Sequence, residues 1–186
     1  MRERRPGADE IANLKGRIAE AFVETIFRRA GYTVSRIGRE SQVQRLVKLG
    51  ADEFLPDFLL RKLVPGTDAG RPLHRLIPIE VKYRANVEAF LAEYGDELLP
   101  RIGDQWPELC LVLVTDHPAP RRSCFQVIDL SVTQADVPLA SVDLHRIPDL
   151  DVYDTTVREY EGLVRRIFPL LRLGTATGSA PGQVAT

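Results

Sequence analysis

Two carboxylates and one ammonium group in the first half of the chain have the types and the spacing for metal-assisted phosphate chemistry. Asp57 follows Pro56 at the start of an apolar run, and Glu80 and Lys82 end a second apolar run at residues 77–83. If this second run is a strand, alternate side chains share a face, so Glu80 and Lys82 project together. Pairing of the two runs would place Asp57 beside Glu80. Two carboxylates can hold Mg²⁺, and an adjacent cation can orient a water molecule or a phosphate.

The two apolar runs are expected to pair as a hairpin with a long loop. Turn-forming residues lie between them at positions 65–70, which include two glycines and a proline. We expect residues 64–75 to form this loop. Its basic side chains, Arg71 and Arg75 together with His74, either reach DNA or decorate the surface.

The spacing of Asp57 and the triplet Glu80-Val81-Lys82 resembles the motif of the PD-(D/E)xK nuclease superfamily. The resemblance covers residues 11–130 and implies a restriction-endonuclease-like fold, in which a first helix, a meander carrying the motif, a crossover helix and further strands follow one another. It implies that Asp57, Glu80 and the Val81 carbonyl hold Mg²⁺, that Mn²⁺ substitutes for it, and that Lys82 is catalytic. The separation of Asp57 from Glu80 is longer than in compact members.

Other polar residues join the candidate site through the same resemblance. Many members have an acidic residue on the first helix, and Glu20 matches that position, whereas Glu24, four residues later, is expected to be a solvated helix edge. Arg84 shares the strand face of Lys82 and is a candidate phosphate contact. Gln105 is either a substrate contact or an ordinary loop residue, and we expect Trp106 to be a packing residue.

The resemblance implies a Mg²⁺-dependent nuclease that hydrolyses DNA phosphodiester bonds, with a junction-resolvase or restriction-like branch as the nearest type. The alternative is a catalytically silent module that uses the same fold to bind DNA or a partner protein. The near balance of 25 basic and 26 acidic residues slightly favours the module. The intact set of Asp57, Glu80 and Lys82 favours the enzyme.

Length and composition predict one domain. The chain has 186 residues, of which 44% are hydrophobic, and contains no internal repeat. We expect a flexible N-terminus at residues 1–10, a single domain at 11–173 and a disordered tail at 174–186. The absence of a signal peptide and of a long apolar run predicts a cytoplasmic chain without a membrane partner. A homodimer is possible, and Cys110 and Cys124 lack zinc-site spacing.

Hydrophobic periodicity predicts the elements that position these residues. Helical spacing covers residues 11–30, 87–99 and 151–173, and strand-length apolar runs lie at 32–37, 109–115 and 124–130, outside the hairpin. Residues 41–50 fit a short helix and a strand almost equally well. This order predicts an α/β fold with a central mixed β-sheet flanked by helices.

Overall fold

The computed structural model describes residues 7–37, 54–68, 70–96, 98–130 and 139–171. The elements in chain order are α1 (Ala8–Arg29), β1 (Thr33–Arg36), β2 (Phe58–Asp68), β3 (Arg71–Tyr83), α2 (Val87–Tyr94), α3 (Leu98–Gln105), β4 (Cys110–Val114), β5 (Phe125–Asp129), β6 (Val142–Asp143), the 3-10 helices η3 (Leu144–Arg146) and η4 (Pro148–Leu150), and α4 (Asp154–Leu170).

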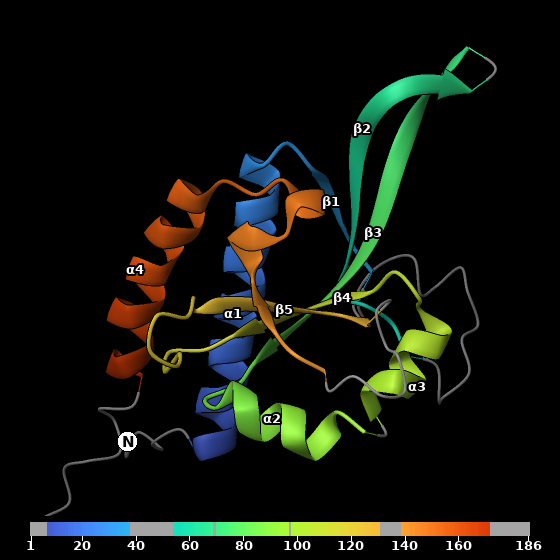
Figure 1. The fold of residues 1–186 in the computed structure, drawn as a ribbon. Coiled ribbons are helices and arrows are strands. Elements are labelled where there is room, and N and C mark those ends of the chain that lie inside the picture. Colours follow the sequence, from blue (N-terminus) through green and yellow to red (C-terminus); the bar gives the residue numbers. More distant parts are fainter. Residues whose placement is uncertain (1–6, 38–53, 69, 97, 131–138, 172–186) are drawn as a thin grey trace, which may run out of the picture.

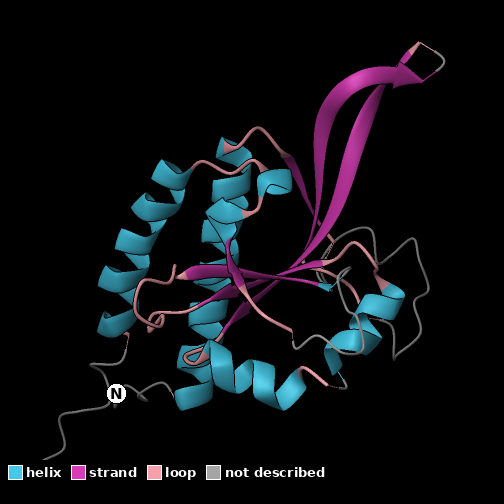
Figure 2. Cartoon of the chain, in the orientation of Figure 1, coloured by secondary structure: helices cyan, strands magenta, loops and turns pink. Residues whose placement is uncertain are grey.

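Within these residues, six strands form one mixed sheet whose strand order follows the sequence (Figure 1, Figure 2). Neighbouring strands run antiparallel except β3 and β4, which are parallel. A parallel pair requires a crossover connection, and α2 and α3 supply it. The predicted α/β class with a central mixed sheet flanked by helices is therefore confirmed.

Helix α1 begins earlier than the sequence predicts. The backbone N–H of Gly7 donates to the Glu10 carboxylate at 2.8 Å, which closes the first turn. Residues 8–10, which the sequence assigns to the N-terminal segment 1–10, form the first turn of α1, and residues 1–6 lie outside the described part. At the other end, Gly31 adopts φ +85°, the left-handed conformation expected of a helix-terminating glycine.

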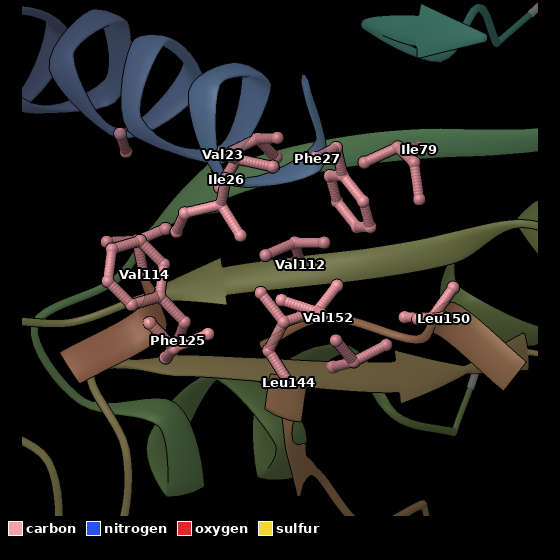
Figure 3. Packing of buried hydrophobic residues seen from close by; sticks show 14 of the residues in the cluster. Val23, Ile26, Phe27, Ile79, Val112, Val114, Phe125, Leu144, Leu150 and Val152 are labelled. Carbon is pink, nitrogen blue, oxygen red and sulfur yellow. The ribbon is translucent and has the colours of Figure 1, made fainter. Parts of the chain in front are cut away.

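The main hydrophobic core lies between the sheet and the helices α1 and α4, and Figure 3 shows the part of it next to α1. The helix α1 contributes Val23, Ile26 and Phe27, all fully buried. The helical spacing at 11–30 predicts an apolar buried face, but on this helix Leu14 is exposed and the neighbouring Lys15 is buried. Further core residues come from the strands, from the 3-10 helices η3 and η4 and from the segment after them: Ile79, Val112, Val114, Phe125, Leu144, Leu150 and Val152.

A second core lies between the opposite face of the sheet and the helices α2 and α3. Strand β4 is buried on both faces, as its continuous apolar run predicts. The single helix predicted at 87–99 is instead two helices, since α2 ends before Gly95. Pro100 sits in the first turn of α3, where its missing N–H has no helical partner to lose.

The predicted loop at 64–75 is wrong. Strands β2 and β3 continue through it as a long hairpin that projects from the body of the molecule (Figure 1). The ladder shifts register between Val64 and Thr67, so Pro65 and Gly66 sit in a bulge, where Gly66 takes φ +115°. Bulges and free edges are the positions in a sheet that accept proline, and this is why turn-forming residues did not end the strand.

The C-terminal part agrees with its periodicity. Helix α4 ends one residue after Pro169, as expected for a proline that shortens it, while β6, η3 and η4 were not predicted. The segments 41–50 and 174–186, for which the sequence makes predictions, lie outside the described residues. In the part of the chain that the structure describes, no helix combines the length and the apolar character needed to cross a membrane.

Candidate active site

The start of β2 and the end of β3 bring Asp57, Glu80 and Lys82 together. The backbone N–H of Asp57 donates to the Glu80 carboxylate at 3.2 Å, and the Asp57 carboxylate accepts a hydrogen bond from the Val81 N–H at 2.8 Å. The Lys82 ammonium donates to the other oxygen of Glu80. The three side chains that the sequence predicts to converge therefore form one hydrogen-bonded cluster.

Strand register accounts for this convergence. Phe58 pairs with Ile79. Asp57, the residue before Phe58, therefore lies opposite Glu80, the residue after Ile79. The N–H of Ile37, just after β1, donates to the Asp57 carbonyl at 2.9 Å and holds the segment that enters β2. Side chains in strands alternate between faces, and so Glu80 and Asp57 share the face opposite to the buried Phe58 and Ile79.

Glu80 is the most deeply buried carboxylate of this cluster, with 4% of its surface exposed. Burial raises the pKa of Glu80 to about 7, the Lys82 ammonium opposes the shift, and the negative charge of Asp57 adds to it. Glu80, Lys82 and Arg84 border a pocket of about 210 Å³ between the sheet, α2 and α3, whose remaining lining is mainly apolar and includes Phe90.

This burial predicts that Glu80 destabilises the metal-free fold at neutral pH. A carboxyl group whose pKa rises on folding stabilises the fold while both states are protonated, below 4.5, and this contribution is lost as the pH rises to about 7. We expect Glu80→Gln to be more stable than the parent at pH 8 by roughly 1–3 kcal/mol, and to gain less at pH 5.

Urea unfolding in a chelating buffer at the two pH values measures this difference. Glu88→Gln, on the exposed face of α2, is the matched control. A loss of stability at pH 8 would mean that Glu80 and Lys82 form a stabilising ion pair, and the argument for a functional carboxylate would lose its support.

Glu20 of α1 lies next to the cluster. Burial raises its pKa, the charge of Asp57 adds to the shift, and Arg36 opposes it. The Arg36 guanidinium lies 3.6 Å from Glu20 and 2.6 Å from Glu24. Glu24 differs, because hydrogen bonds from Arg28 and Arg36 outweigh its burial and lower its pKa. The predicted contrast between the two glutamates is therefore present, although Glu24 is an ion-paired residue and not a solvated edge.

A groove of about 480 Å³ separates α1 from the end of β3. Glu20 and Arg17 line it from the helix, and Val81, Lys82 and Arg84 line it from the strand. The groove therefore combines three cationic side chains with one carboxylate, next to the Asp57–Glu80 pair. A polyanion that enters the groove would contact Lys82 close to the carboxylates of Asp57 and Glu80.

The position of Glu20 predicts an effect on metal affinity. If the cluster holds a divalent cation, Glu20→Gln removes a nearby negative charge and should weaken Mn²⁺ binding by about tenfold, a typical result for a residue that supports metal ligands. Isothermal titration with Mn²⁺ measures it. Glu24→Gln is the matched control and should leave the affinity unchanged, and equal affinities in both variants would remove Glu20 from the site.

The predicted substrate contacts have structural partners of their own. The Arg84 guanidinium donates to the Tyr83 carbonyl at 2.8 Å and lies 4.8 Å from the Phe90 ring, so its position is held from two sides. Gln105, the last residue of α3, accepts a hydrogen bond from the Phe54 N–H at 3.3 Å. Substrate binding by Arg84 and Gln105 stays a prediction.

Trp106 is a packing residue, as predicted. Its indole N–H donates to the Phe54 carbonyl at 2.9 Å. Together with Gln105 it therefore ties the chain just ahead of Asp57 to the end of α3, and this contact supports the position of the Asp57 carboxylate.

Sequence reasoning missed a buried ionic cluster beside the groove. The Lys15 ammonium of α1 contacts the Asp116 carboxylate at 3.0 Å and the Tyr83 hydroxyl at 3.1 Å, and Tyr83 also donates to Asp116 at 2.8 Å. Burial alone would raise the pKa of Asp116, but hydrogen bonds from Tyr83, Lys15 and His117 lower it. A lysine at a helix position flanked by apolar residues was the available signal.

Comparisons of the chain with protein-family models, with curated proteins and with solved structures found no match. Among the described residues, no group of three or more His, Cys, Asp or Glu side chains is arranged to hold a metal ion. The predicted Mg²⁺ ligands are fewer, since they comprise the carboxylates of Asp57 and Glu80 and the Val81 carbonyl. Mg²⁺ commonly keeps several waters and binds one or two carboxylates plus phosphate oxygens.

Proposed function

We propose that this protein is a metal-dependent nuclease that hydrolyses DNA phosphodiester bonds. The observation that carries the proposal is the cluster of Asp57, Glu80 and Lys82, in which a buried carboxylate with a raised pKa lies between a second carboxylate and an ammonium group. Such a cluster is costly to bury and contributes little as a structural ion pair. Strongly shifted pKa values beside a groove are typical of functional sites.

We also propose that the chain has a restriction-endonuclease-like fold. A first helix, a meander β1–β2–β3 that carries the motif, and a crossover to the parallel strand β4 follow the order of a restriction-endonuclease-like core. The long hairpin formed by β2 and β3 is an extension of that core.

The residues present fit Mg²⁺ or Mn²⁺. Asp57, Glu80 and the Val81 carbonyl are hard oxygen donors. Burial, with the charge of Asp57 added to it, raises the pKa of Glu80, and a divalent cation at this position would stabilise the ionised carboxylate. When bound, such an ion acts as a Lewis acid on a phosphate and lowers the pKa of coordinated water.

The protein side chains supply position and charge. The Lys82 ammonium lies at the border of the groove and can hold a phosphate oxygen, while Glu80 accepts its hydrogen bond and orients it. Arg17 and Arg84 line the groove on opposite walls, where they can contact neighbouring phosphates. The apolar pocket behind Glu80 keeps this charge cluster in a weakly polar environment, which strengthens its electrostatic effect on the substrate.

Incubation with single-stranded, duplex and branched DNA, with Mg²⁺ or Mn²⁺ and with EDTA as the control, tests the proposal. We expect cleavage that depends on the metal. Binding without metal-dependent cleavage on every substrate would instead identify a catalytically silent module.

A further inference from the structure

Beyond its base, the distal part of the β2–β3 hairpin pairs with no other strand among the described residues. This segment, here called the arm, comprises residues 61–68 of β2 and 71–76 of β3. The partner β1 ends its pairing with β2 at Arg61, and β4 pairs with β3 only from Ile79 onward. Figure 1 shows the arm leaving the body of the molecule. Isolated two-stranded ribbons are marginally stable in water, so an arm of this length is best explained by a partner that covers it.

Charge is concentrated on the arm. The arm has four basic residues and one acidic residue. The whole chain has 25 basic and 26 acidic residues, so the rest of the chain has 21 basic and 25 acidic residues. At its base, Lys62 and Arg75 pair with Asp151 and Asp149 at 2.7 and 3.2 Å. Within the described residues, Arg61 and Arg71 have no acidic partner within ion-pair distance, so their charges are available to an anion.

Apolar side chains lie between these charges. Leu63 is 62% exposed and Leu76 is 48% exposed. By strand alternation, both lie on the same face of the arm as Arg61. Glu80 lies on the same face, farther along β3. Arg61 is directly opposite Leu76 in the ladder. This face therefore places the Arg61 guanidinium beside two exposed leucines, and it continues into the candidate site.

We propose that the arm lies in a groove of duplex DNA, so that the substrate of the candidate site is double-stranded; this identification of the substrate rests on the proposed function. The major groove of B-DNA, about 12 Å wide, admits a two-stranded β-ribbon, and a single strand has no such groove. Arginine binds phosphates and guanine edges, and leucine contacts thymine methyl groups or base steps.

The connection between the arm and the candidate site supports binding of one duplex by both. Asp57 directly precedes β2, and Glu80 and Lys82 lie on β3, so the two strands of the arm are the two strands that hold the site. At about 3.3 Å per residue, the eight residues 61–68 extend roughly 26 Å from the body. A duplex held along the arm would therefore present its backbone to the groove lined by Arg17 and Lys82.

Charge reversal at the two unpaired arginines tests the proposal. The variant Arg61→Glu with Arg71→Glu is compared with Arg101→Glu with Arg166→Glu, an equal charge change at exposed positions of α3 and α4. Binding of a fluorescent duplex, and of one of its strands alone, is measured in EDTA over a range of salt concentrations. Circular dichroism and thermal melting confirm that both variants are folded.

We expect the arm variant to lose at least tenfold in duplex affinity and to lower the log–log salt slope by about 2, one for each phosphate contact removed. The control variant, Arg101→Glu with Arg166→Glu, should keep the parental duplex affinity and the parental salt slope. The variant Leu63→Ala with Leu76→Ala should bind more weakly with an unchanged salt slope, because apolar contacts release no counterions.

The outcomes separate this inference from the proposed function, because binding in EDTA requires no cleavage. Duplex binding that the arm variant retains, preferred binding of the single strand, or no binding by the parent protein would each overturn the role of the arm. Arm-dependent duplex binding without cleavage in Mg²⁺ or Mn²⁺ would support the arm and contradict the nuclease. Unchanged binding together with loss of a dimer in sedimentation would identify the arm as an interface between two copies.

Discussion

Asp57→Asn and Lys82→Ala are each expected to slow metal-dependent DNA cleavage by on the order of 10²–10³-fold, because electrostatic stabilisation of the transition state is usually the largest contribution to catalysis. Asparagine removes the charge of Asp57 but retains an oxygen that can accept the Val81 N–H. Lys82 is partly exposed, so its truncation leaves no buried cavity. Asp57→Asn should therefore fold normally. Because Lys82→Ala leaves the buried Glu80 without its ammonium partner, circular dichroism is used to confirm that this variant is folded.

DNA affinity should respond differently from the cleavage rate. Binding depends on phosphate contacts spread over the surface and weakens with salt. Without metal, Asp57→Asn should bind as tightly as the parent or more tightly, since it has lost a charge that repels phosphate. Cleavage rates under single-turnover conditions and affinities in EDTA measure the two effects separately.

Asp104→Asn, an exposed change of the same type on α3, is the control for Asp57→Asn and should cleave at the parental rate. Cleavage that survives both Asp57→Asn and Lys82→Ala would show that another site, or a contaminant, is responsible. In that case the cluster would have to be interpreted as a structural ion pair.

Asp116→Ala is expected to destabilise the fold by about 3–5 kcal/mol, the typical cost of leaving a buried charge without its partner. The side chains of Lys15 and Asp116 are 3% and 0% exposed, so water cannot replace the lost carboxylate. Lys15→Met combined with Asp116→Ala should recover part of the loss, because no uncompensated ammonium remains. Urea unfolding at neutral pH measures all three free energies.

The exposed pair of Arg29 and Glu159 provides the control, since Glu159→Ala should cost less than about 1 kcal/mol. A similarly small cost for Asp116→Ala would contradict the burial of the pair. The lowered pKa of Asp116 also sets the pH dependence: its stabilisation is present above the unfolded pKa and is lost as the pH falls through the lower folded value.

Local patterns were sufficient for the elements whose own residues decide their conformation. Periodicity located α1, β1, β4, β5 and α4, because helix and strand spacing depend on short-range geometry. Alternation along β3 placed Glu80 and Lys82 on one face. The convergence with Asp57 also followed, since strand pairing between the two apolar runs fixes which residues lie opposite one another.

Local patterns failed where distant residues compensate for a local cost. Turn-forming residues at 65–66 predicted a loop, but a bulge at a free sheet edge accommodates them within β2. The burial of Lys15 on α1 was not predicted, because it depends on Asp116, which lies 101 positions away in the sequence.

The sequence by itself determined the types of the site residues and their order on two strands, because backbone alternation is a local property. Only the tertiary structure decided their chemistry. Burial beneath α2 and α3, beside Asp57, raises the pKa of Glu80, and the packing of α1 across the end of β3 encloses the groove that contains Glu20. Desolvation and charge proximity depend on which elements cover a residue, and those elements come from distant parts of the chain.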